Sequence, residues 1–324
     1  MRIVCACQEE FNAIPDGFCG EIEIRFGKFG SPAVVDWRFD SAVIEAHDNV
    51  LIYAFDNAVI YAYDDAAIEA HDNAKIKAYD NVVIDAYNNA VIEAHDNAKI
   101  MAYDNAKINA YDDAAIEAHN NAVIMAYDNA VIYACDDVVI EAYDNAKIEA
   151  HDDAVVNSYG VTKVIAYDEA LIEAHDQSVV LLFNDCEARY DDLVVMYKGP
   201  ISNTQYLNFF DCKITNHGTA ILYKAAHKLG DVYRSHHDKD FTYKIGDVIT
   251  PQNGFSTNIF RTCAPGIHCA PLEWVKNFSC KWKNRAILEV EVPVSGIIVP
   301  DETDGKCRVP WAKVLREVEA KLLP

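Results

Sequence analysis

Residues 41–184 consist of eighteen tandem octads, and no other feature limits the possible folds of this chain as strongly. The consensus is Asn/Asp, Ala/Val, x, Ile, x, Ala, Tyr/His, Asp, with apolar residues at positions 2, 4 and 6. This alternation has the period of a β-strand with one buried face. The Asp-Asn or Asp-Asp pair between octads favours a tight corner, because these side chains tolerate turn backbones. Since one octad cannot bury its apolar face alone, the octads must stack as a solenoid.

The histidines of the array indicate how many octads close one coil. Histidine occupies position 7 of six octads, at residues 47, 71, 95, 119, 151 and 175. Because four of the five spacings are 24 residues, we predict a three-sided parallel β-helix of about six coils, with 24 residues per coil. Parallel crossovers favour a right-handed path. A two-sided coil of sixteen residues is the alternative, but it distributes the histidines over both sides.

In the three-sided arrangement, one outer face carries stacked Glu-x-His pairs. Their glutamates are Glu45, Glu69, Glu93 and Glu117. The matching internal ladder is Ile44, Ile68, Ile92 and Ile116. Stacked imidazoles about 4.8 Å apart could share a zinc ion. However, Tyr or Phe occupies the same position in most other octads, so each His is more simply one aromatic ring stacked on the next, and we predict no metal.

The chain divides into three predicted regions. Residues 1–40 contain irregular strand-like pieces and are expected to cap the first coil, since terminal repeats must differ from internal ones. The octads follow over 41–184. Residues 185–324 have globular composition and predict a small α+β domain, in which ILEVEVP forms a strand and WAKVLREVEAKL, near the end of the chain, forms an amphipathic helix. The whole protein is therefore expected to be mainly β.

The last hundred residues carry a series of short motifs. They are Tyr223-Lys224, FTYKIGD (241–247), CAPGIHC (263–269), ILEVEV (287–292) and GKCRVPW (305–311). This series resembles a C-terminal domain of unknown function in phage and bacterial proteins, where it often follows β-helical octad or pentapeptide repeats. The resemblance implies a phage or prophage setting and no assigned activity. It marks these residues: Tyr223, Lys224, His268, Glu289, Glu291, Lys306 and Arg308.

None of these motifs predicts a particular chemistry. Cys263, His268 and Cys269 lack the second close pair that zinc sites usually have. Adjacent residues on a strand point in opposite directions, which disfavours a Cys/His nucleophilic dyad. Glu289 and Glu291 could serve acid–base chemistry, but solvated carboxylates are commoner. No phosphate-binding glycine loop, nucleophile elbow or dinucleotide fingerprint is present, so we predict no catalytic residues and no cofactor.

The octads hold almost all of the net charge. The chain carries −23, and residues 41–184 contain 27 Asp and Glu against six Lys, a net charge of −21. Over six coils this is about one charge per 1.4 Å, close to the ~1.7 Å of duplex DNA. We expect the corner aspartates to form one column, in which neighbours repel by about 0.9 kcal/mol in water. They are Asp56, Asp80, Asp104, Asp128, Asp152 and Asp176.

These observations favour a non-enzymatic acidic binding protein. Its expected partner is a protein with a basic surface, and a DNA mimic that inhibits a host nucleic-acid-binding or defence protein is one form of this. The alternatives are a structural or virion-associated rod and a nucleotide-dependent modifying enzyme in the C-terminal domain. Direct binding to nucleic acid or a membrane is not expected. The N-terminus lacks the apolar run of a signal peptide and the ten cysteines are thinly spread, so a cytoplasmic protein is predicted.

Overall fold

A computed structural model shows a mainly β chain. It describes residues 2–15, 18–25, 33–36, 43–184, 186–230, 232–236, 241–252, 254–261, 264–279, 282–300 and 305–318. The chain forms two compact units, Met1–Met196 and Tyr197–Pro324. Among the described helices, none is long and apolar enough to cross a membrane.

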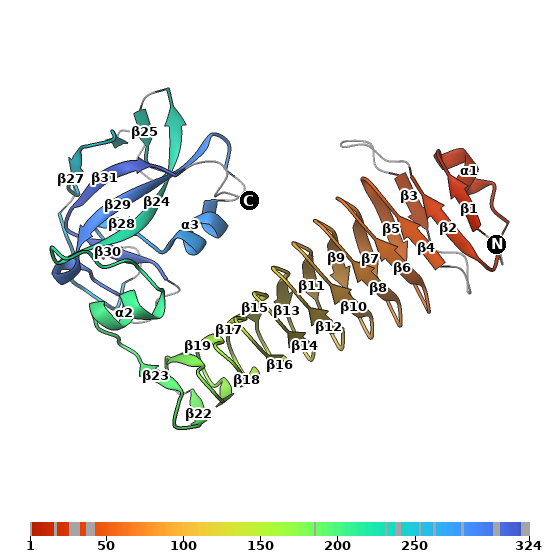
Figure 1. Ribbon diagram of the computed structural model, residues 1–324, viewed down its shortest axis with the longest axis horizontal. Coiled ribbons are helices and arrows are strands. Elements are labelled where there is room, and N and C mark those ends of the chain that lie inside the picture. Colours follow the sequence, from red (N-terminus) through yellow and green to blue (C-terminus); the bar gives the residue numbers. More distant parts are fainter. Residues whose placement is uncertain are drawn as a thin grey trace. The chain divides into compact units, whose positions relative to one another are not determined.

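The first unit is a parallel β-solenoid built from two sheets, whose strands alternate along the chain (Figure 1). The first sheet contains β1 (Arg2–Cys5), β2 (Glu21–Ile24), β4 (Val43–Ala46), β6 (Val59–Ala62), β8 (Lys75–Ala78), β10 (Val91–Ala94), β12 (Lys107–Ala110), β14 (Val123–Ala126), β16 (Val139–Ala142), β18 (Val155–Ser158), β20 (Leu171–Ala174) and β22 (Glu187–Tyr190). The second contains β3 (Ala33–Asp36), β5 (Val50–Ala54), β7 (Ala67–Ala70), β9 (Val83–Ala86), β11 (Lys99–Ala102), β13 (Ala115–Ala118), β15 (Val131–Ala134), β17 (Lys147–Ala150), β19 (Lys163–Ala166), β21 (Val179–Leu182) and β23 (Val195–Lys198). A short helix, α1 (Gln8–Asn12), follows β1.

The prediction of a parallel β-helix is confirmed, but the predicted coil of three octads is wrong. Within the octads, each strand pairs with the strand sixteen residues away, as in Ile92 with Ile76 and Ile108, so one coil holds two octads and has two sides. The 24-residue spacing of the histidines is one and a half coils. The array therefore makes nine coils rather than six. Its right-handed path stays a prediction.

The inward residues explain why two sides suffice. Positions 2, 4 and 6 are buried along the array, and most octads supply one Ile and two Ala. Two facing sheets can pack Ile directly against the opposite strand at the density of a protein interior. A triangular bore lined by the same residues would leave a central void. The predicted ladder is consequently divided, with Ile44 and Ile92 in the first sheet and Ile68 and Ile116 in the second.

The corners form as the Asp/Asn pattern predicts. The residue at position 8 adopts a left-handed backbone, for example φ +61° at Asp80 and +57° at Asp104. Asp and Asn tolerate this conformation better than other residues with a Cβ atom. In the next coil, the residue after the corner donates its N–H to the position-8 carbonyl, as Asn97 does to Asp80 over 2.9 Å. Each corner therefore bonds its backbone to its neighbour.

The second unit is an α+β domain around an antiparallel six-stranded sheet of order β26-β25-β24-β29-β31-β27. Its described elements are α2 (Asn203–Phe209), β24 (Thr219–Leu229), β25 (Val232–Arg234), β26 (Thr242–Tyr243), β27 (Val248–Ile249), β28 (Ile267–Cys269), α3 (Leu272–Ser279), β29 (Arg285–Pro293), a 3-10 turn (Val294–Gly296), β30 (Cys307–Val309) and β31 (Ala312–Glu317). β28 and β30 form a separate two-stranded sheet.

ILEVEVP lies in β29, so this predicted strand is confirmed. The predicted helix over WAKVLREVEAKL is wrong where the structure describes it, because Ala312–Glu317 is the strand β31. β31 pairs antiparallel with β29 and buries Ala312 and Val314 while Lys313 is exposed. The same residues fit a helical and an alternating apolar pattern, and pairing with the central strand decides between them.

Candidate functional sites

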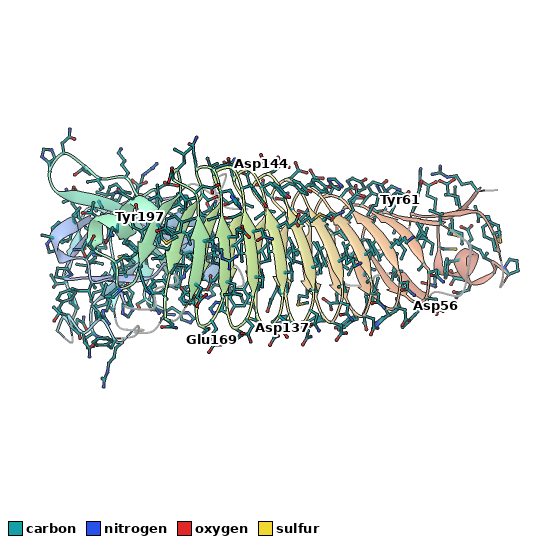
Figure 2. The ribbon with its side chains drawn as sticks, turned by 90° about the horizontal axis from the view of Figure 1, so that it is seen from below. Asp56, Tyr61, Asp137, Asp144, Glu169 and Tyr197 are labelled. Carbon is teal, nitrogen blue, oxygen red and sulfur yellow. The ribbon has the colours of Figure 1, made fainter. Side chains whose placement is uncertain are left out.

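The corner residues at position 8 form two columns, one at each edge of the solenoid. Figure 2 shows Asp144 at one long edge and Asp56 and Asp137 at the opposite edge. The first column, after the strands of the first sheet, is Asp48, Asp64, Asp80, Asp96, Asp112, Asp128, Asp144, Gly160 and Asp176. The second is Asp56, Asp72, Asn88, Asp104, Asn120, Asp136, Asp152, Asp168 and Asn184.

The six aspartates predicted to form one column are therefore divided between two. Asp80, Asp128 and Asp176 lie in the first column. Asp56, Asp104 and Asp152 lie in the second. All six are exposed, and within each column consecutive predicted members lie three coils apart. The prediction of a single column failed because it depended on the 24-residue coil.

Column members also bond one another. In the first column, the backbone N–H of one corner donates to the carboxylate of the next, at 3.1 Å from Asp48 to Asp64 and 3.3 Å from Asp80 to Asp96. In the second, Asn88 donates to Asp104 over 3.2 Å. These bonds point the carboxylates along the edge and partly compensate their mutual repulsion.

The histidines belong to two aromatic columns beside the corners. In one, His95 lies between Tyr79 and Tyr111 with ring centroids 5.0 and 4.8 Å away and interplanar angles of 8° and 7°. In the other, His71 lies between Phe55 and Tyr87 at 4.9 Å from each. The interpretation of each histidine as one ring in an aromatic stack is confirmed.

The four outward glutamates do not form one ladder. Glu45 and Glu93 lie on the first sheet, whereas Glu69 and Glu117 lie on the second. Glu93 accepts from Lys77 over 2.7 Å, and Glu45 accepts from Arg2 over 2.8 Å. Glu69 and Glu117 contact the histidines two residues on, at 3.0 and 3.4 Å. Each glutamate therefore has a local partner and none forms part of a continuous row.

Among the described residues, one group of side chains is close enough to hold a metal ion. It comprises Glu23, Glu45 and His47, whose ligand atoms lie within 4.8 Å of one another. Glu23 is buried, and its carboxylate already pairs with Arg2 and Arg25. The two guanidinium groups supply the positive charge that a cation would otherwise provide. Cys263 and Cys280 lie outside the described residues.

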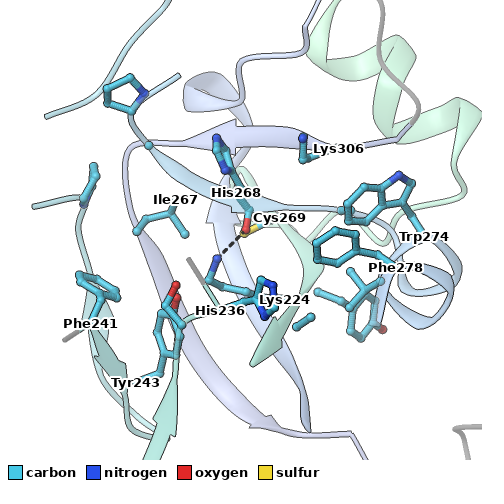
Figure 3. A pocket seen from close by; sticks show the side chains of 18 of the residues that line it. Lys224, His236, Phe241, Tyr243, Ile267, His268, Cys269, Trp274, Phe278 and Lys306 are labelled. Atoms are coloured by element: carbon cyan, nitrogen blue, oxygen red, sulfur yellow. Dashed lines mark hydrogen bonds between the residues drawn. The ribbon is translucent and has the colours of Figure 1, made fainter. Parts of the chain in front are cut away.

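The C-terminal domain contains a pocket of about 740 Å³, within the range of small-molecule sites. Tyr223 and Lys224 come from β24, His268 from β28, and Lys306 lies just before β30. Four of the seven residues marked by the motif series therefore meet in one cavity (Figure 3). Sequence reasoning grouped these residues by resemblance and did not predict the pocket.

The other three marked residues stabilise the domain. Glu289 pairs with Arg316 at 2.7 Å, and Glu291 accepts from the Thr219 hydroxyl at 2.6 Å. Arg308 is fully buried and donates to the main-chain carbonyls of Arg261 and Asn258. These contacts hold strands or a loop in place, and none of the three residues lines the pocket.

Aromatic residues make up much of the pocket wall. Trp274 and Phe278 are four residues apart on α3 and stack at 4.9 Å, while His236 stacks on Trp282 at 4.0 Å. Figure 3 places Phe241 and Tyr243 on the side opposite Trp274 and Phe278. The spacing of Trp274 and Phe278 puts both on one helix face, and this was the signal that the sequence analysis missed.

Hydrogen bonds and charge define the protonation state at the centre of the pocket. Lys224 donates to the main-chain carbonyl of His268 over 3.0 Å, and the Nε2 of His268 lies 3.0 Å from the carbonyl of Ala264. Because a carbonyl only accepts, Nε2 carries the proton and Nδ1 is an acceptor. Burial and the nearby charge of Lys224 lower the pKa of His268 to about 4. Burial also raises the pKa of the Cys269 thiol to about 11, so it is protonated at neutral pH.

No family model matches this chain, and no curated protein or solved structure matches it either. The assignment of a parallel solenoid to the tandem octads therefore rests on the strand pairing described above. The resemblance of the motif series to a phage-type domain stays a prediction.

Proposed function

We propose that the solenoid is a polyanionic surface that binds the basic face of a protein partner. The observation that carries this proposal is the pair of corner columns, in which exposed carboxylates occupy eight of nine corners along one edge and six of nine along the other. Parallel strands are about 4.8 Å apart, so nine coils span about 43 Å. A net charge of −21 over that length is about one charge per 2.1 Å, against ~1.7 Å for duplex DNA.

A surface of this kind suits a partner whose basic groove normally holds nucleic acid. The charge lies on a rigid rod whose corners bond to one another, so little conformational entropy is lost when the partner binds. The motif resemblance adds a setting in which a phage product acts on a host nucleic-acid-binding or defence protein. Such a protein would need no catalytic residue in the solenoid.

In the test, bacterial proteins that bind immobilised duplex DNA are collected first. They are then passed over the immobilised full-length protein. Specific capture should weaken steeply with salt, and free duplex DNA should compete for the captured protein. The corner variant changes four consecutive members of the first column to Asn: Asp64, Asp80, Asp96 and Asp112. The control changes four outward glutamates on the sheet faces to Gln: Glu117, Glu141, Glu149 and Glu173.

Both variants remove four charges, so net charge alone predicts equal losses of binding. The proposal predicts a much larger loss for the corner variant. Capture that ignores DNA competition, or equal losses in both variants, contradicts it. The absence of any specific capture also contradicts it, and favours the two other candidate functions, a structural rod and a modifying enzyme in the C-terminal domain.

A further inference from the structure

The C-terminal pocket gathers positively charged side chains. The residues described as lining the pocket include Lys224 and Lys306 and no Asp or Glu. Lys224 is half-buried and held by the main-chain carbonyl of His268 at 3.0 Å. Two lysines in the described lining of a partly enclosed cavity favour an anionic ligand.

The aromatic wall adds a second requirement for the ligand. Phe278 is 44% exposed although it lines the pocket, and it stacks on Trp274 at 4.9 Å with an interplanar angle of 18°. An apolar ring left accessible inside a cavity offers a face for another planar group. Stacking on aromatic side chains is the usual way in which proteins hold nucleobases without reading their sequence.

The cationic and aromatic parts of the pocket are held next to each other by Gly305. A Cβ atom at Gly305 would lie 3.1 Å from Cδ1 of Trp274, so the backbone passes directly against the indole. The backbone φ of +119° at Gly305 also favours glycine. The buried hydroxyl of Tyr206 donates to the Gly305 carbonyl over 2.6 Å. These contacts fix the backbone next to Lys306, which lines the same pocket as Trp274 (Figure 3).

We infer that this pocket binds a nucleotide, with its base against the Trp274 and Phe278 wall and its phosphates near Lys224 and Lys306. A volume of about 740 Å³ accommodates a mononucleotide or dinucleotide. His268 contributes a neutral imidazole whose Nδ1 can accept a hydrogen bond from the sugar or base. This inference does not depend on the solenoid's role, and it replaces the sequence-based expectation of no cofactor.

The experiment titrates the full-length protein with ADP and follows tryptophan fluorescence and heat of binding. Adenosine and inorganic pyrophosphate are the comparison probes, because each offers only one of the two recognised parts. ADP should bind at least about tenfold more tightly than either, since each part contributes separately. Its binding should quench fluorescence through Trp274.

Three variants locate the site. Lys306→Met and Trp274→Leu should each weaken ADP binding about tenfold or more, and Trp274→Leu should also lose most of the quench. Lys313→Met is the control, because this exposed lysine lies on β31 and does not line the pocket. Thermal melting of each variant shows that the domain is folded.

Five results overturn the inference, and the first four concern the ligands and the control. They are no ADP binding at millimolar concentration, equal affinity for adenosine, equal affinity for pyrophosphate, and an equal loss in Lys313→Met. A folded Lys306→Met variant that binds ADP as the parent does also overturns it. None of these results bears on capture of a basic partner by the solenoid, so the two proposals fail separately.

Discussion

The backbone N–H of Asp64 donates to Oδ2 of Asp80, one coil further along, over 3.3 Å. Asp80 in turn donates its own N–H to Asp96 over 3.3 Å. Each carboxylate therefore has a neighbouring carboxylate about 4.8 Å away on either side and a backbone donor between them. Asp104 in the other column has a different environment, because its neighbours are Asn88 and Asn120.

This difference makes Asp80→Asn and Asp104→Asn a matched pair. Asn keeps an oxygen acceptor and tolerates the left-handed corner, so each change removes one charge and little else. Asp80→Asn should raise the Tm by about 1–3 °C at low salt, since it relieves two repulsions, and the gain should shrink at high salt. Asp104→Asn should give no gain. Equal effects of the two changes in melting experiments would contradict the sixteen-residue coil.

The core offers a stronger perturbation. Ile92 is fully buried between Ile76 and Ile108. Ile92→Asp places an unpaired charge in an apolar interior and should cost more than about 3 kcal/mol, enough to unfold neighbouring coils. Circular dichroism and denaturant unfolding measure the loss. Ile92→Val should cost only about 1 kcal/mol and controls for the change in shape.

Substitutions at outward positions test which strands pair, because an added charge stabilises or destabilises the solenoid according to the charge of its cross-strand neighbours. Met101 on β11 pairs with Asp85 on β9 and Glu117 on β13. Met101→Lys should be neutral or stabilising, as Lys77 beside Glu93 illustrates at 2.7 Å, whereas Met101→Asp should destabilise. A 24-residue coil would put Met101 beside Lys77 and Met125 and reverse this order. Comparing the Tm of the two variants at low salt distinguishes the arrangements.

The octads predict the strands, the inward positions and the corners correctly, because each depends on contacts within eight residues. The number of octads per coil depends on which strands pair, and histidine spacing is a poor guide because Tyr, Phe and His are interchangeable in the aromatic columns. Two buried polar residues indicate the length of the coil better than the histidines do. Thr162 and Ser178 occupy inward positions sixteen residues apart, and their hydroxyls bond at 3.0 Å.

The pocket could be predicted only in part. Tyr223, Lys224, His268 and Lys306 were identified by resemblance, and all four line it. Their convergence depends on β28 pairing with β30, which brings His268 opposite Arg308 across a separation of 40 residues. No local pattern encodes such a pairing. The corners can be predicted because their contacts join residues close in sequence. The pocket cannot, because its contacts join residues far apart in sequence.

His151 provides the last test, through the pH dependence of stability. It lies in an aromatic column, with its ring 4.5 Å from Tyr167, and its Nε2 is 3.2 Å from Glu149. Burial by itself would lower the pKa of His151, but the hydrogen bond to Glu149 and the charges of Asp168 and Asp152 raise it above its ordinary value. The folded state therefore binds the proton more tightly than the unfolded chain.

Because the pKa of His151 is higher in the folded state, protonated His151 stabilises the fold. This stabilisation is fully present below the unfolded-state pKa of about 6.5 and is lost as the pH rises through the folded-state pKa. The Tm of the parent should therefore fall, relative to that of His151→Tyr, as pH increases from about 6 to 8. Tyr fills the same position in most other octads, so it keeps the stack and removes the titration. Glu149→Gln should reduce the same pH dependence while His151 is retained, because it removes the hydrogen-bonded anion. A parent and a His151→Tyr variant whose Tm values run parallel across this range would show that His151 does not titrate with a raised pKa.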